Sequence, residues 1–206
     1  MLKIWGRTNS INVQKALWCA DELGIKYVRE DAGLQFGKNH EPWYLAMNPN
    51  GLVPTIDDDG FTLWESHTIV RYLAAKHSMG NLYPSDPRTR ADAERWMDWS
   101  LSTLFQDSRD LFWGWVRTAP DKRDMAALER ARKSLCGIWG RLDSWLERRQ
   151  YVAGENFTMG DIPPGAWAYR WYALPIERPE LPHVKAWYDR LTQRPAYRET
   201  VMLPMS

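Results

Sequence analysis

The chain of 206 residues has only two cysteines, Cys19 and Cys136, and they lie far apart in the sequence. A disulfide framework is therefore disfavoured, and so few cysteines are typical of a reducing compartment. No apolar run approaches the roughly 20 residues that a membrane-spanning helix needs. The first residues, Met1 to Trp5, have the pattern of a strand and not of a secretory signal. We therefore expect a cytoplasmic protein.

Neither sign of charge is in excess, because 27 basic residues stand against 26 acidic ones and the net charge is +1. Proteins that bind nucleic acid or an acidic membrane surface usually carry a strongly basic face, so neither partner is expected. The four histidines and two cysteines are scattered without the spacing of metal ligands, so no metal site is predicted.

Tryptophan, by contrast, is abundant: the chain has thirteen, most of them in its second half. Large aromatic side chains are expected first of all to fill a helical core. Some of them could also line an aromatic ligand pocket or a subunit interface, where tryptophan is enriched.

The two halves of the chain differ in their predicted secondary structure. In the first eighty residues we predict strands and helices in alternation: strands over 2–5, 26–29, 55–57 and 61–64, and helices over 12–23, 42–47 and 66–77. This order predicts a four-stranded mixed sheet with helices on its faces, the thioredoxin-like arrangement. After residue 87 only helical patterns follow, over 90–105, 124–149, 161–172 and 183–192. We therefore predict an α/β domain over 1–82 and an all-α domain over 88–206.

The segment from Asn48 to Ile56 places Pro54 where a strand should begin. If the Val53–Pro54 bond is cis, the N–H and C=O of Val53 face outward and can pair with an extended peptide as one more strand. Nine residues later, Glu65 and Ser66 open a helix, and the N-terminus of a helix suits a carboxylate. Together these features predict a pocket for a small peptide that carries a free carboxylate.

The sequence Thr158-Met159-Gly160-Asp161 has the pattern of a capping box, with Thr158 at the N-cap and Asp161 at N3. Phe157 and Ile162 on either side of it match a hydrophobic staple. We interpret this motif as a folding signal and not as part of a chemical site.

Four motifs resemble those of the glutathione transferases, in order and over essentially the whole chain. They are Ser10-x-Asn12-Val13, Asn48-Pro49-x-Gly51-x-Val53-Pro54, Glu65-Ser66-x-x-Ile69-x-x-Tyr72-Leu73 and Phe157-Thr158-x-x-Asp161. The first is most similar to bacterial serine-type, phi- and theta-like members of the cytosolic family. The resemblance implies a thioredoxin-like glutathione-binding domain, a helical domain that forms the electrophile site, and a homodimer that pairs the first domain of one subunit with the second domain of the other.

The activity that the resemblance implies is conjugation of the glutathione thiolate to small electrophiles, of the detoxification type, with glutathione as co-substrate and no bound cofactor. A free thiol has a pKa of about 8.5, so the enzyme must stabilise the thiolate. A hydroxyl group at the positive end of a helix can do so. Ser10 or Asn12 would act on the sulfur, with Thr8 and Asn9 as weaker candidates. From the local sequence alone, Ser10 could equally be an N-cap.

The resemblance also implies the remaining contacts. Those with glutathione would come from Asn12, Asn39, His40, Val53, Glu65 and Ser66. Asn39 and His40 replace the more typical histidine and lysine at the glycyl carboxylate, and Lys38 is an alternative there. The electrophile pocket would be formed by Phe105, Arg109, Phe112, Trp113 and Arg117, and aromatic rings with arginine favour apolar or haloacid-like substrates.

Two rival functions stay open at this point. One is a glutathione-dependent peroxidase or haloacid dehalogenase that uses the same site. The other is a non-catalytic binding module, because one fold serves many functions. The loop before the first helix contains no cysteine, which disfavours thiol–disulfide exchange through a cysteine of the enzyme.

Overall fold

A four-stranded sheet organises the first part of the chain in the computed structural model, which describes all of residues 1–206. Its strands are β1 (Leu2–Trp5), β2 (Tyr27–Glu30), β3 (Thr55–Asp58) and β4 (Phe61–Trp64), in the spatial order β2-β1-β3-β4. β1 runs parallel to β2 and antiparallel to β3, and β3 pairs antiparallel with β4. The predicted mixed sheet is confirmed, with β2 beginning one residue later than expected.

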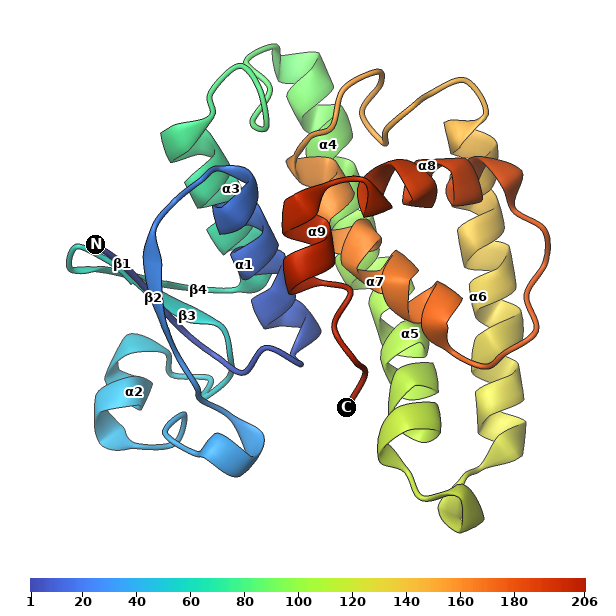
Figure 1. The fold of residues 1–206 in the computed structure, drawn as a ribbon, viewed down its shortest axis with the longest axis horizontal. Helices are drawn as coiled ribbons and strands as arrows, with labels where there is room; N and C mark the ends of the chain where they lie inside the picture. Colours follow the sequence, from blue (N-terminus) through green and yellow to red (C-terminus); the bar gives the residue numbers. More distant parts are fainter.

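Helices α1 (Ile11–Glu22) and α3 (Ser66–His77) pack against each other beside the sheet (Figure 1). The short helix α2 (Pro42–Met47) and the 3-10 turn η1 (Leu34–Phe36) belong to the connection between β2 and β3. α1 also contacts α7 and α9 of the second half of the chain. Because it is enclosed in this way, α1 buries residues around most of its circumference, including Val13, Ala16 and Trp18.

The second half is helical. Its first helix runs without interruption from residue 87 to 117 and has two π-helical segments. Its parts are α4 (Pro87–Trp99), η2 (Ser100–Leu104), α5 (Phe105–Phe112) and η3 (Trp113–Arg117). The prediction of a helix over 90–105 was wrong at both ends. The helix starts at Pro87 because Asp86 caps it, its side chain accepting a hydrogen bond from Thr89 N at 2.8 Å.

The other helical elements follow in sequence. They are η4 (Pro120–Lys122), α6 (Met125–Leu146), η5 (Met159–Asp161), α7 (Ile162–Ala173), α8 (Pro182–Thr192) and α9 (Pro195–Thr200). Three of them match the predicted helices to within a few residues. α9 was not predicted, because six residues are too few to show a helical period.

The capping box before α7 is present as predicted. Thr158 Oγ1 accepts a hydrogen bond from Gly160 N at 3.3 Å, and Asp161 Oδ2 accepts one from Thr158 N at 2.9 Å. Asp161 Oδ1 also accepts hydrogen bonds from Val152 N and from the indole of Trp187, both at 2.9 Å. This fully buried carboxylate therefore joins the start of α7 to the preceding loop and to α8.

One cluster of 41 buried residues extends through both halves of the chain. Trp18 of α1 meets Tyr197 of α9 edge to face, with ring centroids 4.6 Å apart. Trp18, Trp139 and Trp187 are fully buried, as expected of tryptophans that fill a core. The domain boundaries at residues 82 and 88 stay a prediction, because the core is continuous across them. None of the helices combines the length and the apolar character that crossing a bilayer requires.

Candidate functional site

A buried polar network holds the turn that leads into β3. Asn48 Nδ2 donates to Leu52 O at 2.9 Å, and the hydroxyl of Tyr44 donates to the same oxygen at 2.7 Å. The Val53–Pro54 bond is cis. The N–H and C=O of Val53 take no part in the backbone hydrogen bonds of the turns and loops. Both groups are therefore free to pair with an extended peptide.

Ser10 lies at the N-cap of α1, with an extended backbone (φ −85°, ψ 122°), but its side chain makes no capping hydrogen bond. The N-cap interpretation thus accounts for its position and not for its hydroxyl, which is free to donate to a ligand. Asn12 lies in the first turn of the same helix. Its Oδ1 accepts hydrogen bonds from Lys15 Nζ at 3.0 Å and from Ser66 Oγ at 3.4 Å. Its NH₂ group has no acceptor within the protein.

Ser10 and Asn12 line a cavity of about 120 Å³ whose opposite wall is the long helix of the second half. That helix contributes Phe105, Arg109, Trp113 and Arg117, four of the five residues predicted for an electrophile pocket.

These four side chains follow one another at intervals of four residues. In an α-helix, residues four apart drift by about 40° around the axis at each step. The π-helical segment η3 has wider turns, which offset part of this drift and keep the four on one stripe. Phe112 lies off the stripe: it is only 1% exposed and does not line the cavity. The guanidinium of Arg170 stacks on its ring, 3.9 Å from the centroid, so Phe112 supports the wall from behind.

Two arginines of the cavity were not predicted, Arg7 before α1 and Arg170 on α7. No local pattern links residues so far apart in the sequence, so only the fold reveals the pair. Burial, together with repulsion from Arg117 and Arg7, lowers the pKa of Arg170 to about 9. All three remain protonated near neutral pH.

The positive charge of this cavity is not compensated by any acidic side chain of its lining. None of the residues that line it is acidic. Arg170 donates to Asn9 O, a neutral peptide oxygen, at 3.1 Å, and Arg117 donates to Ser206 O, a main-chain oxygen of the last residue, at 3.1 Å. Arg109, at the rim, instead pairs with Asp110 at 2.9 Å. The cavity can therefore stabilise a negative charge that a substrate brings or that develops in a reaction.

Glu65 and Ser66 stand at the start of α3, where the Ser66 hydroxyl reaches Asn12. Glu65 has φ +70° and ψ 111°, a conformation that is uncommon for a residue other than glycine and often marks a functional position. Its side chain is exposed and makes no capping hydrogen bond. The carboxylate is therefore available to a cationic group of a ligand.

Asn39 and His40 are engaged in holding the backbone at Gly51. Asn39 Nδ2 donates to Gly51 O at 2.6 Å and lies 3.1 Å from His40 Nε2. Gly51 has φ +59°, and a Cβ there would come within 2.9 Å of the His40 ring. The Asn39 amide is thus already used. Lys38, whose Nζ lies 3.3 Å from Glu30 Oε2 in a partly exposed ion pair, supplies an accessible cation in this loop.

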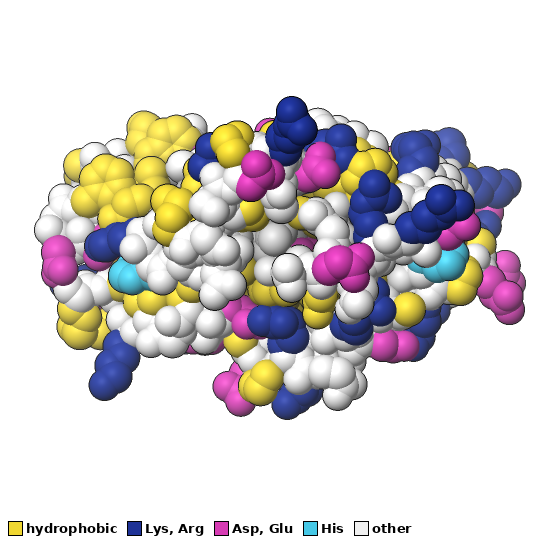
Figure 2. Space-filling model, turned by 90° about the horizontal axis from the view of Figure 1, so that it is seen from above, with side chains coloured by type: hydrophobic (Ala, Val, Ile, Leu, Met, Phe, Trp, Pro, Cys, Tyr) yellow, Lys and Arg dark blue, Asp and Glu magenta, His cyan; other side chains and the backbone are white.

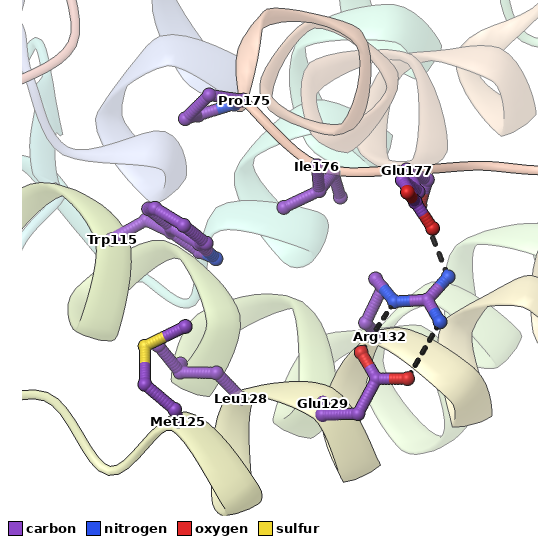
Figure 3. A pocket seen from close by; sticks show the side chains of 8 residues that line it. All are labelled: Trp115, Met125, Leu128, Glu129, Arg132, Pro175, Ile176 and Glu177. Carbon is purple, nitrogen blue, oxygen red and sulfur yellow. Dashed lines mark hydrogen bonds and ion pairs between the residues drawn. The ribbon is translucent and has the colours of Figure 1, made fainter.

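A second cavity, of about 220 Å³, lies between η3, the start of α6 and the segment after α7 (Figure 3). Its one cation, Arg132, is held by both carboxylate oxygens of Glu129 at 2.7 Å and by Glu177 O at 3.1 Å. The charge is compensated, and no free hydroxyl or amide donor faces it among the lining residues. Although it is larger, this cavity lacks the uncompensated groups of the cavity at Ser10.

Comparison with known proteins gives consistent findings. The family models described as "Glutathione S-transferase, N-terminal domain" and "Glutathione S-transferase, C-terminal domain" match residues 9–76 and 97–195. The chain is 42% identical to glutathione S-transferase GstB of Escherichia coli, with 100% of both chains covered. It is 30% identical to glutathione S-transferase 3 of Zea mays, over 97% of this chain and 93% of that protein.

Among solved structures, the chain is similar to a theta class glutathione S-transferase from the citrus canker pathogen Xanthomonas axonopodis pv. citri, determined with glutathione bound. The sequence identity is 50%, the TM-score is 0.96, and the match covers 100% of this chain and 99% of that one.

Proposed function

The chain belongs to the cytosolic glutathione S-transferase family and is a glutathione transferase with glutathione as its co-substrate; from this premise we propose that Ser10 and Asn12 ionise the glutathione thiol and that the arginine-rich side of the same cavity takes the electrophile. The observation that carries this proposal is the meeting of two kinds of group in one cavity. A free hydroxyl and a free amide N–H stand on one wall, and aromatic rings with guanidinium groups, without an acidic side chain in the lining, stand on the other.

The first step is loss of the thiol proton to solvent. Lowering the pKa of the thiol by two units requires about 2.7 kcal/mol of preferential stabilisation of the thiolate. Hydrogen bonds from the Ser10 hydroxyl and the Asn12 amide, together with the positive end of α1, are an adequate source. The thiolate then attacks the electrophilic carbon. A C–S bond forms, and the bond to the leaving group breaks with its electron pair on that group.

The tripeptide would lie along the turn before β3 and the start of α3. Val53 offers its unpaired N–H and C=O to the cysteinyl part, as an added strand would use them. Glu65 offers a carboxylate to the γ-glutamyl ammonium group, and the backbone N–H groups at the N-terminus of α3, from Ser66 onward, receive its carboxylate. The glycyl carboxylate would bind at the loop of Asn39 and His40, where Lys38 is an accessible cation.

The electrophiles that suit this cavity are small and carry, or develop, negative charge. Arg7, Arg117 and Arg170 supply three positive charges without an acidic neighbour in the cavity lining. This observation favours haloacids as a second class of substrate, in which halide is displaced while a guanidinium holds the carboxylate. Rates with a neutral aryl halide, its carboxylated analogue, a haloacetate and cumene hydroperoxide, compared side by side, separate conjugation, dehalogenation and peroxidase activity. A preference for the neutral aryl halide over its carboxylated analogue would contradict the proposed substrate class.

The roles of Ser10 and Asn12 are tested by substitution. We expect Ser10→Ala or Asn12→Ala to lower turnover by about ten-fold or more, because one good hydrogen bond to a charged group is worth roughly 1.5–3 kcal/mol. Affinity for glutathione should be largely kept. Thr8→Ala, in the same loop but outside the cavity lining, is the matched control. If both variants retain full activity, the assignment is wrong.

We further propose a homodimer that works in cytoplasmic detoxification. Hydrophobic side chains gather at the sheet end of the molecule, whereas lysine and arginine gather over the helical end (Figure 2). Exposed Trp43, Leu52 and Phe61 belong to the sheet half, and such surface is typical of an interface. Cys19 and Cys136 are both free thiols, which suits a reducing compartment. Light scattering at the mass of a single chain would contradict the dimer.

A further inference from the structure

A buried lysine lies directly behind Asn12. Lys15 is only 1% exposed, and none of the ion pairs of the protein includes it. Its Nζ lies 3.0 Å from Asn12 Oδ1 and 3.0 Å from Nε2 of His67 on α3. Burying an ammonium group without a carboxylate partner is unfavourable for folding. A lysine in this position therefore suggests a role in function.

We propose that Lys15 is a positioning residue for the transferase reaction: it turns the NH₂ group of Asn12 toward the glutathione sulfur and places a positive charge behind that group. The inference rests on the proposed function, in which Asn12 donates to the sulfur. It extends that function to a residue that does not line the cavity and cannot touch the substrate.

The orientation of Asn12 follows from the donors around it. An ammonium group only donates hydrogen bonds, and the oxygen of an amide only accepts them. Lys15 from α1 and Ser66 from α3 both direct donors at the same oxygen, Asn12 Oδ1. With the amide reversed, its NH₂ would face the ammonium group, donor against donor. The two helices thus hold the amide in the one orientation in which its N–H groups point away from Lys15.

His67 leaves the charge of Lys15 uncompensated. Burial, together with the charges of Lys15 and Arg71, lowers the pKa of His67 to about 2. The imidazole is therefore neutral, and its Nε2 accepts a hydrogen bond from Lys15. Both side-chain partners of Lys15, Asn12 and His67, are neutral. An anion that binds beside Asn12 would add to the compensation that Glu65 gives from the start of α3.

The charge of Lys15 can respond to such an anion. Burial and the charge of Arg170 on α7 lower the pKa of Lys15 to about 7, although Glu65 at the start of α3 acts in the opposite direction. The residue is therefore partly protonated near neutral pH before glutathione binds. A thiolate nearby favours the ammonium form, and by linkage the ammonium form favours the thiolate to the same extent. A lysine on the surface, already fully protonated at this pH, would not show this coupling.

The first test is a titration of enzyme-bound glutathione, followed by the ultraviolet absorbance of its thiolate, in wild type and Lys15→Met. We expect the thiol pKa in the variant to rise by about one unit or more, the usual effect of removing a nearby opposite charge. The pH profile of turnover should move up by the same amount, while KM for glutathione changes little. Lys15→Gln can still donate a hydrogen bond to Asn12 but carries no charge. Its thiol pKa should lie between those of wild type and Lys15→Met. Lys76→Met, at an exposed ion pair on the same helix as His67, should match wild type.

A second test uses the wild type alone and does not depend on whether a variant folds. Calorimetry in buffers of different ionisation enthalpy gives the number of protons released when glutathione binds at pH 7, with S-methylglutathione as the thiol-free control. We expect fewer protons to be released to the buffer than thiolates are formed, because Lys15 takes up some of the protons that the thiols lose. Equal numbers would overturn the proposal, as would a folded Lys15→Met with the wild-type thiol pKa. Either result leaves the proposed function standing, because the wild-type protein forms the thiolate in both cases.

Discussion

Replacing Asp161 by alanine tests the packing that supports the site. The buried carboxylate accepts hydrogen bonds from Val152 N, Thr158 N and Trp187 Nε1, each at 2.9 Å. A buried donor left without an acceptor costs about 1–3 kcal/mol. Burial raises the pKa of Asp161 to about 6, so its negative charge is unfavourable there. Removing this charge offsets part of the stability that is lost with the hydrogen bonds. We expect a net decrease of about 3–5 kcal/mol in the free energy of unfolding, comparable to breaking a buried polar pair.

This effect should be measured by urea denaturation and by thermal melting. For a chain of this length each kcal/mol corresponds to roughly 2–4 °C, so the melting temperature should fall by about 10 °C. Affinity for glutathione should be nearly unchanged, because Asp161 does not line the cavity. Asp189→Ala, which removes only an exposed ion pair with Lys185, should cost less than about 1 kcal/mol. A loss below 1 kcal/mol for Asp161→Ala would mean that the buried carboxylate does not hold these three donors.

Two further predictions concern stability. The pKa of Lys15 falls from 10.5 to about 7 on folding. Between these pH values Lys15 is protonated in the unfolded chain and largely neutral in the folded one, so the free energy of unfolding rises with pH. From pH 7 to 9.5, the free energy of unfolding of wild type relative to Lys15→Met should increase by about 3 kcal/mol in urea denaturation; a constant difference would contradict the assignment. A Cβ on Gly160 would lie 2.7 Å from the backbone oxygen of Ala93, whereas one on Gly137 in α6 meets nothing within 4 Å. Gly160→Ala should therefore destabilise by about 1–3 kcal/mol and Gly137→Ala should stabilise by about 0.5–1 kcal/mol, with opposite shifts in melting temperature; shifts of the same sign would count against this packing.

The sequence predicted the parts of the protein that local chemistry determines. Periodicity and short motifs determine the sheet, the capping box at Thr158 and the order of the two halves. A single sequence contains both kinds of signal. The π-helical segments of the long helix left no such signal, so its extension to Arg117 was not foreseen. Phe105, Arg109, Trp113 and Arg117 were nevertheless predicted from the family resemblance, and they share one stripe of this helix because side chains four apart lie on one face.

What the sequence could not show are contacts between distant segments. Arg7 and Arg170 meet only because α1 packs against α7. By residue type, Lys15 would be placed on a solvated face, whereas α1 is enclosed by other helices and buries it. The engagement of Asn39 with Gly51 depends in the same way on how two loops fold together.

The most direct measurement is ultraviolet difference spectroscopy of the purified protein with glutathione across pH, alongside calorimetry of the same samples. Bound glutathione should titrate at least one unit below the roughly 8.5 of a free thiol, with heat of binding at neutral pH. If glutathione gives no heat and no thiolate absorbance appears near neutral pH, the cavity at Ser10 and Asn12 does not ionise it, and the account is wrong.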